Sequence, residues 1–491
     1  MTSNRPVQAP GQAAADAEPP ASRAAGPRPH GDDLGERHRA SARVADVLFG
    51  TTQPRTGSGW KRAALIAALI VAGTLISLYR TPMHSWNVLW AEDAAIFLDG
   101  ALNGGPAAVF EPWAGYWHVV PRLAILVAAA VPFGVIPLAV TITAAFLTSL
   151  IACACFVLLE TRLRSVPLRF AAWLVVIALP IAGGEVINNL ANLHWFLIVA
   201  AFCAVLVRSR SVAFAVLQAV VLFCAVGSDP LALVLLPVVL LRWWLLPAWR
   251  DRSIIIAFLA AAIVQVAVTY TGTLVTSGRT FSSDFPTPPE FLEFYAYRVV
   301  LTSLFGTEGS MWIAARAGAT FSGLMLAGAL VLLVVGAVRN ADRRWAIIGF
   351  GLGSVLFAAV VYSLQWYQLA AAGAMTIADG SRYAVVPSAL LLIAVLLSVD
   401  ALVSELRTPW IRIVSGAVVL CLIALPALFG LRWYNGRDGA VVWPDALRTA
   451  SEECSTATGE RHVEVKGAPF GFPGVNVSCD LLAPFGRNGR G

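Results

Sequence analysis

Long apolar blocks separated by short polar links constrain this chain more than any other feature. The blocks run to roughly 17–25 residues, which is the length at which a helix crosses a bilayer. With 58% apolar and only 13% charged residues, the chain has more apolar side chain than one soluble core can bury, because soluble domains carry about 25% charged residues. The pattern excludes a soluble enzyme and predicts an all-α polytopic membrane protein.

The net charge of +6 does not indicate a nucleic-acid partner. Binding to nucleic acid needs basic residues gathered on one soluble face, whereas here they are scattered through the links between apolar blocks. Short cytoplasmic links collect Lys and Arg, so these residues report orientation. The basic residues of alternate links are Arg162, Arg164, Arg169, Arg208, Arg210, Arg242, Arg250, Arg252, Arg339, Arg343, Arg344, Arg407 and Arg412.

This alternation predicts about eleven spans, with the N-terminus in the cytoplasm and the C-terminus outside. We expect the plasma (inner) membrane of a bacterium, because the high Ala, Val, Arg and Gly usage fits a GC-rich bacterial source. The predicted spans are 63–78, 137–159, 168–183, 195–207, 212–226, 231–246, 254–272, 320–338, 345–364, 383–404 and 411–431. Residues 273–319 then form a long outer loop.

Three units follow from the same pattern. Residues 1–58 are rich in Pro, Ala and Gly and poor in large apolar side chains, so they predict a disordered cytoplasmic tail. Residues 59–431 form the transmembrane domain. Residues 432–491 predict a small extracytoplasmic domain with a helix near 441–450, strands near 462–466 and 475–479, and a disulfide between Cys454 and Cys479, since an outer compartment is oxidising.

Residues 119–134 are apolar but short, and they contain Pro121, Arg122 and Pro132. A crossing at this point would place Arg162, Arg164 and Arg169 outside and break the alternation of charge. We therefore predict a helix that lies along the outer interface or re-enters the membrane.

Polar residues accumulate in the outer links, and each is costly in hydrocarbon unless it has a partner or a function. The first outer loop carries Glu92 and Asp93, which are adjacent and so point about 100° apart on a helix. The other candidates for binding substrate are His118, Arg122, Asn189, Asn192, His194, Asp229, Arg382 and Tyr383.

Structural roles remain open for several of these residues. One of Glu92 and Asp93 could cap the following helix. Arg122 could extend to lipid headgroups, and Asp229 could cap the next span. Arg382 opens a span from the outer side, where Arg is disfavoured, and its planar guanidinium suits a phosphate.

The first outer loop resembles the GT-C superfamily of polytopic glycosyltransferases. The resemblance lies in Trp90-Ala91-Glu92-Asp93, a bend at Gly104-Gly105 and the stretch Tyr116-Trp117-His118-Val119-Val120-Pro121-Arg122-Leu123. The Glu-Asp order and the single proline differ from many protein mannosyltransferase relatives. The superfamily also has interface helices in the first outer loop and, like this chain, Arg-Tyr at the start of a late span (Arg382-Tyr383).

The resemblance implies an inverting transferase that uses a polyprenyl-phosphate sugar as donor. Asp93, or else Glu92, would be the general base, and Arg382, with Arg122, would neutralise the lipid phosphate. His118, Asn189, Asn192, His194 and Asp229 would bind hydroxyl groups of the sugar or of a glycan, lipid or protein acceptor. The resemblance implies no definite cofactor; some members of the superfamily use a divalent metal, which Asp93, Asp229 and His194 could hold here.

Two other functions stay open. A ligase or polymerase of lipid-linked glycans would share an outward cavity and arginines for phosphate. A membrane transporter would need broken helices in two matching halves, and the sequence has no internal repeat.

Overall fold

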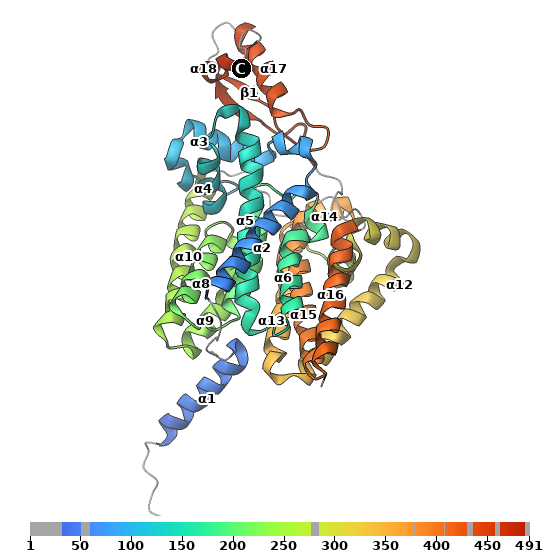
Figure 1. Ribbon diagram of the computed structural model, residues 1–491. Coiled ribbons are helices and arrows are strands. Elements are labelled where there is room, and N and C mark those ends of the chain that lie inside the picture. Colours follow the sequence, from blue (N-terminus) through green and yellow to red (C-terminus); the bar gives the residue numbers. More distant parts are fainter. Residues whose placement is uncertain are drawn as a thin grey trace, which may run out of the picture.

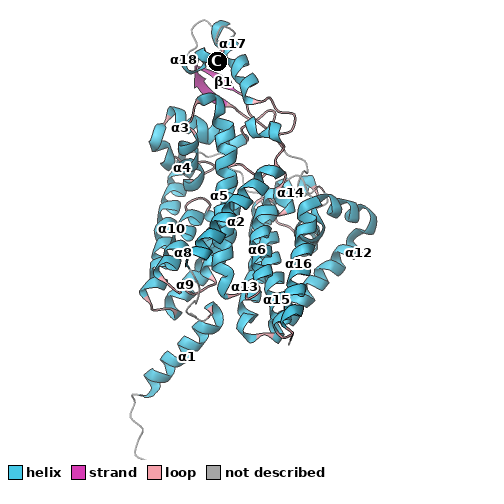
Figure 2. Ribbon diagram, in the orientation of Figure 1, coloured by secondary structure: helices cyan, strands magenta, loops and turns pink. Residues whose placement is uncertain are grey.

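The computed structural model describes residues 32–50, 59–275, 284–374, 376, 380–406, 408–429, 436–456 and 462–486. Figure 1 shows a bundle of roughly parallel helices with α1 at one end and the C-terminal unit at the other. Strands occur only in that C-terminal unit within the described part of the chain (Figure 2).

The helices of the bundle and its flanking segments have these bounds: α1 Asp32–Phe49, α2 Gly59–Arg80, α3 Asp99–Asn103, α4 Val119–Ala128, α5 Ile136–Leu158, α6 Val166–Ala178, α7 Leu193–Val205, α8 Val212–Val226, α9 Leu236–Leu245, α10 Trp249–Val275, α11 Pro288–Tyr295, α12 Thr302–Arg339, α13 Ala341–Leu364, α14 Trp366–Ala372, α15 Val385–Ser404 and α16 Pro409–Phe429.

Six helical stretches of the described chain are long and apolar enough to cross a bilayer: Gly59–Arg80, Phe133–Thr161, Trp249–Thr271, Pro288–Arg339, Ala341–Leu364 and Ser381–Ser404. The protein is thus an all-α chain suited to a membrane. Several other predicted spans correspond to shorter apolar helices such as α7 and α8, so the count of eleven stays a prediction.

The first outer loop contains short helices. Helix α4 has 10 residues, which at about 1.5 Å per residue is half the hydrocarbon thickness. Residues 288–319, predicted as loop, are helical in α11, a π-helical turn at Ala296–Leu301 (η8) and α12. Gly306 and Gly318 interrupt α12 with positive φ angles of 71° and 60°, which glycine adopts without a Cβ clash.

The predicted disordered tail differs from the structure in one part, because α1 forms within it. Phe49 is buried and packs with Ala45 and Leu246. Asp46 forms an ion pair with Arg208 at 2.7 Å. A few apolar residues that are isolated in the sequence of the tail therefore pack against the helical bundle. The rest of the tail lies outside the described residues.

Several basic residues of the links predicted to be cytoplasmic form ion pairs within the protein. Arg242 and Asp251 form a buried ion pair at 2.6 Å, and Arg343 and Asp400 form another at 2.7 Å. Glu160 accepts from three arginines, Arg62, Arg169 and Arg210. Desolvated charges of this kind need partners. The Arg242–Asp251 and Arg169–Glu160 contacts join neighbouring segments, whereas those of Arg62, Arg210 and Arg343 join segments that are distant in the sequence.

The C-terminal unit contains α17 (Trp443–Thr456), β1 (His462–Val465), β2 (Val475–Ser478) and α18 (Cys479–Leu482), with β1 and β2 antiparallel. Cys454 and Cys479 are joined by a disulfide, the pair that the sequence suggested. Trp443 is buried, and its indole N–H donates to the carbonyl of Phe133 at 3.0 Å. This contact docks the unit onto the start of α5.

Removing the disulfide with Cys454→Ser/Cys479→Ser is expected to destabilise this unit by about 3 kcal/mol. The bridge closes the loop between these two residues and so restricts the unfolded chain. Limited proteolysis of the detergent-solubilised protein should then cleave α17 or β1 at least tenfold faster. Cys421→Ser, at a free cysteine, is the control. Equal cleavage rates for all three proteins would contradict the prediction.

Candidate functional site

The two adjacent acidic residues of the first outer loop have different environments. Asp93 begins the π-helical turn Asp93–Leu98 (η2) and has no exposed surface. Its two carboxylate oxygens accept from the backbone N–H groups of Leu190 and Ala191, at 2.9 and 2.8 Å. Glu92 is half-buried. Asp93 thus ties its loop to the link that follows α6.

Burial raises the pKa of Asp93 to about 7, although its two backbone donors and the charge of Arg437 oppose the shift. Arg437 is itself buried, and burial lowers its pKa to about 10. Its guanidinium donates to the carbonyl of Asn188 at 2.6 Å. A residue of the C-terminal unit therefore helps to hold the link that carries Asn188.

The raised pKa of Asp93 predicts a pH-dependent stability. Its folded-state pKa lies above the unfolded value near 3.8, so its contribution to stability is fully present below pH 4 and is lost as the pH rises through about 7. Thermal unfolding of wild type and Asp93→Asn should show this difference between pH 4 and pH 8. A difference in Tm that is constant over this range would contradict the prediction.

Asn189 and Asn192 shape the link instead of pointing free amides at a cavity. Both side chains donate to the backbone carbonyl of Glu185, at 2.6 and 3.1 Å. The amide oxygen of Asn192 also accepts from the indole N–H of Trp195 at 3.0 Å. These bonds fix the turn from which the Glu185 side chain projects.

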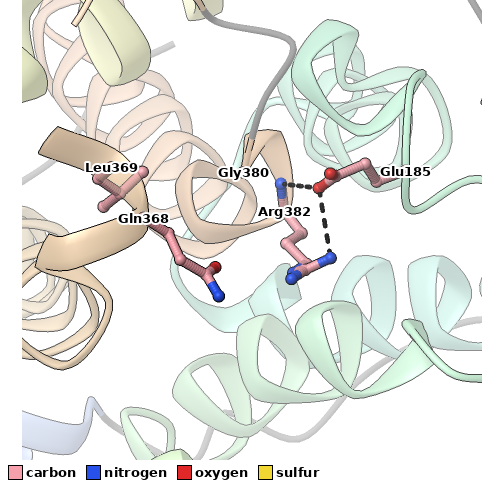
Figure 3. Close-up of a pocket in the computed structure, with 5 residues that line it drawn as sticks. All are labelled: Glu185, Gln368, Leu369, Gly380 and Arg382. Carbon is pink, nitrogen blue, oxygen red and sulfur yellow. Dashed lines mark hydrogen bonds and ion pairs between the residues drawn. The ribbon is translucent and has the colours of Figure 1, made fainter. Parts of the chain in front are cut away.

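Arg382 and Glu185 line a cavity of about 160 Å³ together with Gln368, Leu369 and Gly380 (Figure 3). The backbone N–H of Arg382 donates to Glu185 Oε2 at 3.3 Å, and its guanidinium Nη1 lies 3.8 Å from the same oxygen. About one third of the Arg382 side chain is exposed (34%). The guanidinium is therefore accessible to a ligand.

The hydroxyl of Tyr383 holds the guanidinium of Arg382 by a hydrogen bond. This hydroxyl accepts from Arg382 Nη2 at 3.0 Å and lies 3.1 Å from the amide oxygens of Gln365 and Gln368. Glu92 also acts electrostatically on Arg382. Glu92, in the first outer loop, therefore lies within electrostatic range of Arg382, at the start of a late span.

His194 and Asp229 form a second pair close to this cluster. His194 Nδ1 lies 2.5 Å from Asp229 Oδ2, and the other Asp229 oxygen caps the turn after it by accepting from the N–H of Leu231. Both side chains are buried. Trp195, next to His194, meets the ring of Tyr383 edge-on at 6.0 Å, which links this pair to the cluster around Arg382.

His118 and Arg122 make their contacts within the first outer loop. The His118 ring stacks on Tyr116 at 4.2 Å. Arg122 is buried over the ring of Phe97 and lies 3.6 Å from the carboxylate of Glu111. Arg122 is therefore paired with a protein carboxylate, which differs from the alternative of extension to headgroups.

The described residues include no group of three or more His, Cys, Asp and Glu side chains placed to hold a metal ion. The expected set of Asp93, Asp229 and His194 is not brought together, because Asp93 contacts backbone N–H groups while the other two pair with each other.

Sequence reasoning missed three contributors to the site: Glu185, Gln368 and Arg437. Glu185 lies in the same polar link as Asn189 and Asn192, so the reasoning that selected the two asparagines could also have selected Glu185. Arg437 lies in the C-terminal region, far from every selected residue in the sequence, and no local pattern marks it.

Comparison with protein-family models and with curated proteins finds no match for this chain.

Proposed function

We propose that this protein is a membrane glycosyltransferase that moves a sugar from a polyprenyl-phosphate donor to a cell-envelope acceptor. One observation carries the proposal. A partly exposed guanidinium, Arg382, borders a polar cavity and lies within electrostatic reach of a half-buried carboxylate, Glu92. An anion-binding group next to a candidate base is what transfer from a phosphate donor requires.

The reaction would proceed with inversion. The acceptor hydroxyl oxygen attacks the anomeric carbon, the bond from that carbon to the phosphate oxygen breaks, and its electron pair stays on the lipid phosphate. Glu92 takes the hydroxyl proton, and Arg382 stabilises the charge that develops on the phosphate. Tyr383 and the two glutamines keep the guanidinium in place.

We place the base at Glu92 instead of Asp93, which the sequence favoured. Both oxygens of Asp93 already accept backbone N–H groups and the side chain has no exposed surface. A base must reach the proton that it removes. Asp93 would then hold the loop that carries Glu92, and the His194–Asp229 pair would bind hydroxyl groups of sugar or acceptor.

The same proposal includes the orientation. The end of the bundle at α1 would face the cytoplasm, and the end with the C-terminal unit would face outward, which agrees with their positions at opposite ends of the bundle (Figure 1). The span number and the bacterial inner membrane belong to this proposal.

The decisive test uses the full-length protein in lipid nanodiscs with a panel of labelled polyprenyl-phosphate sugars. Release of lipid monophosphate together with a glycosylated acceptor is the expected result. Activity on diphosphate donors alone would indicate the ligase or polymerase instead. Movement of labelled lipid or sugar across the membrane of proteoliposomes, without a covalent product, would indicate a transporter.

A further inference from the structure

The backbone immediately before Glu92 adopts an unusual conformation. Ala91 has a φ of +33°, in the left-handed region that side chains other than glycine rarely adopt. Such a conformation is strained for a residue with a side chain and persists only where the surroundings impose it. The contacts of Ala91 therefore show what holds this segment.

A loop of the C-terminal unit supplies those contacts. The N–H of Ala91 donates to the carbonyl of Ala468 at 2.5 Å, and the N–H of Ala468 donates to the carbonyl of Leu89 at 2.8 Å. Together they form a parallel bridge between Trp90 and Ala468. Ala468 is fully buried and lies in the connection between β1 and β2.

The approach of the two segments requires small residues. A Cβ on Gly467 would lie 2.9 Å from the carbonyl oxygen of Leu89, and a Cβ on Gly436 would lie 2.3 Å from the ring of Trp90. Gly436 also donates its N–H to the carbonyl of Gly184, next to Glu185. The C-terminal unit thus contacts both loops whose carboxylates lie near Arg382.

The residue on the other side of Glu92 is equally fixed. Asp93 is held by the N–H groups of Leu190 and Ala191 and by the nearby charge of Arg437. Glu92 lies between two anchored neighbours, so the position of its backbone, from which its side chain projects, is fixed by their contacts.

We propose that the C-terminal unit positions the candidate base: the Gly467-Ala468 segment clamps Ala91 in its left-handed conformation and so directs Glu92 toward Arg382. Gly467 and Ala468 are positioning residues, since they act through Ala91. This inference rests on the proposed function, and it makes a unit remote in sequence part of the catalytic apparatus.

The test is Gly467→Ala in the nanodisc assay with the polyprenyl-phosphate sugar that wild type accepts. The added Cβ pushes the loop from Leu89, so kcat is expected to fall about 10²-fold, the effect of displacing a catalytic group by about 1 Å. The KM for donor should stay within twofold, because Arg382 and its cavity are untouched. Gly328→Ala, where a Cβ meets nothing within 4 Å, should keep the wild-type kcat.

Ala91→Gly supplies the second arm. Glycine adopts positive φ without strain, so Ala91→Gly/Gly467→Ala should recover at least part of the kcat that Gly467→Ala loses. A merely structural role would lower kcat, raise KM and lower Tm together, with no recovery, and would overturn the proposal. An unchanged kcat in Gly467→Ala would also overturn it while leaving the proposed function standing, whereas a wild type inactive on every donor would refute the function itself.

Discussion

Glu92→Gln is expected to lower the rate of sugar transfer by about 10²–10⁴-fold, the range for removing a general base. The amide keeps the size of the side chain but cannot take the acceptor proton. Glu92 is only half-buried and acts on Arg382 through its charge. Because the substitution keeps the size of the side chain, the fold should persist. The measurement is kcat for release of lipid monophosphate, with Tm measured on the same sample.

Two variants make this result interpretable. Glu453→Gln, at an exposed position of α17, should leave kcat unchanged. Asp93→Asn replaces an oxygen that accepts a backbone N–H by an amide NH₂, which leaves that donor without a partner. It should therefore lower Tm while a measurable rate remains. Full activity in Glu92→Gln with complete loss in Asp93→Asn at unchanged Tm would assign the base to Asp93.

Asp251→Ala is expected to destabilise the bundle by about 3–5 kcal/mol. It leaves the guanidinium of Arg242 buried without its carboxylate, because Arg242 has no exposed surface and Asp251 almost none. It also removes the acceptor for the N–H of Ser209. Reversible unfolding in mixed micelles would measure the loss.

An exposed ion pair provides the control. Asp342→Ala removes the partner of Arg164, and both side chains are more than half exposed, so it should cost less than about 1 kcal/mol. The double change Arg242→Met/Asp251→Ala should recover part of the lost stability, because it also removes the guanidinium that Asp251→Ala leaves buried without its carboxylate. Similar losses of stability for Asp251→Ala and Asp342→Ala would contradict the prediction that breaking the buried Arg242–Asp251 pair costs more than breaking an exposed pair.

Part of the candidate site could be found from sequence, because polar residues in an otherwise apolar chain are few. Arg382, Tyr383, His194 and Asp229 were selected as polar residues in outer links, and ring contacts connect them in the structure. The same reasoning could not separate side chains exposed to a cavity from those that shape a turn. Asn189 and Asn192 were therefore selected although both bind the carbonyl of Glu185.

The inner arginines show a similar division. Their placement in alternate links predicts orientation, which depends only on the order of charges along the chain. Whether an arginine also forms a buried pair depends on a partner from another helix, as with Arg343 and Asp400. The ends of each helix likewise depend on tertiary packing and on the turns that follow, so the helix lengths could not be predicted from the order of charges.

The all-α membrane class could be predicted from the sequence alone, since apolar blocks of this length cross a bilayer as helices and few other structures satisfy their backbone groups in lipid. The sequence also indicates where a polar site can lie, namely in the links between the apolar blocks, because charged side chains are disfavoured within the hydrocarbon. The tertiary structure was needed to show which of two adjacent carboxylates is buried and which stays partly accessible. Asp93 is buried by its contacts with Leu190 and Ala191, which lie far from it in the chain, so the local sequence could not predict the difference from Glu92.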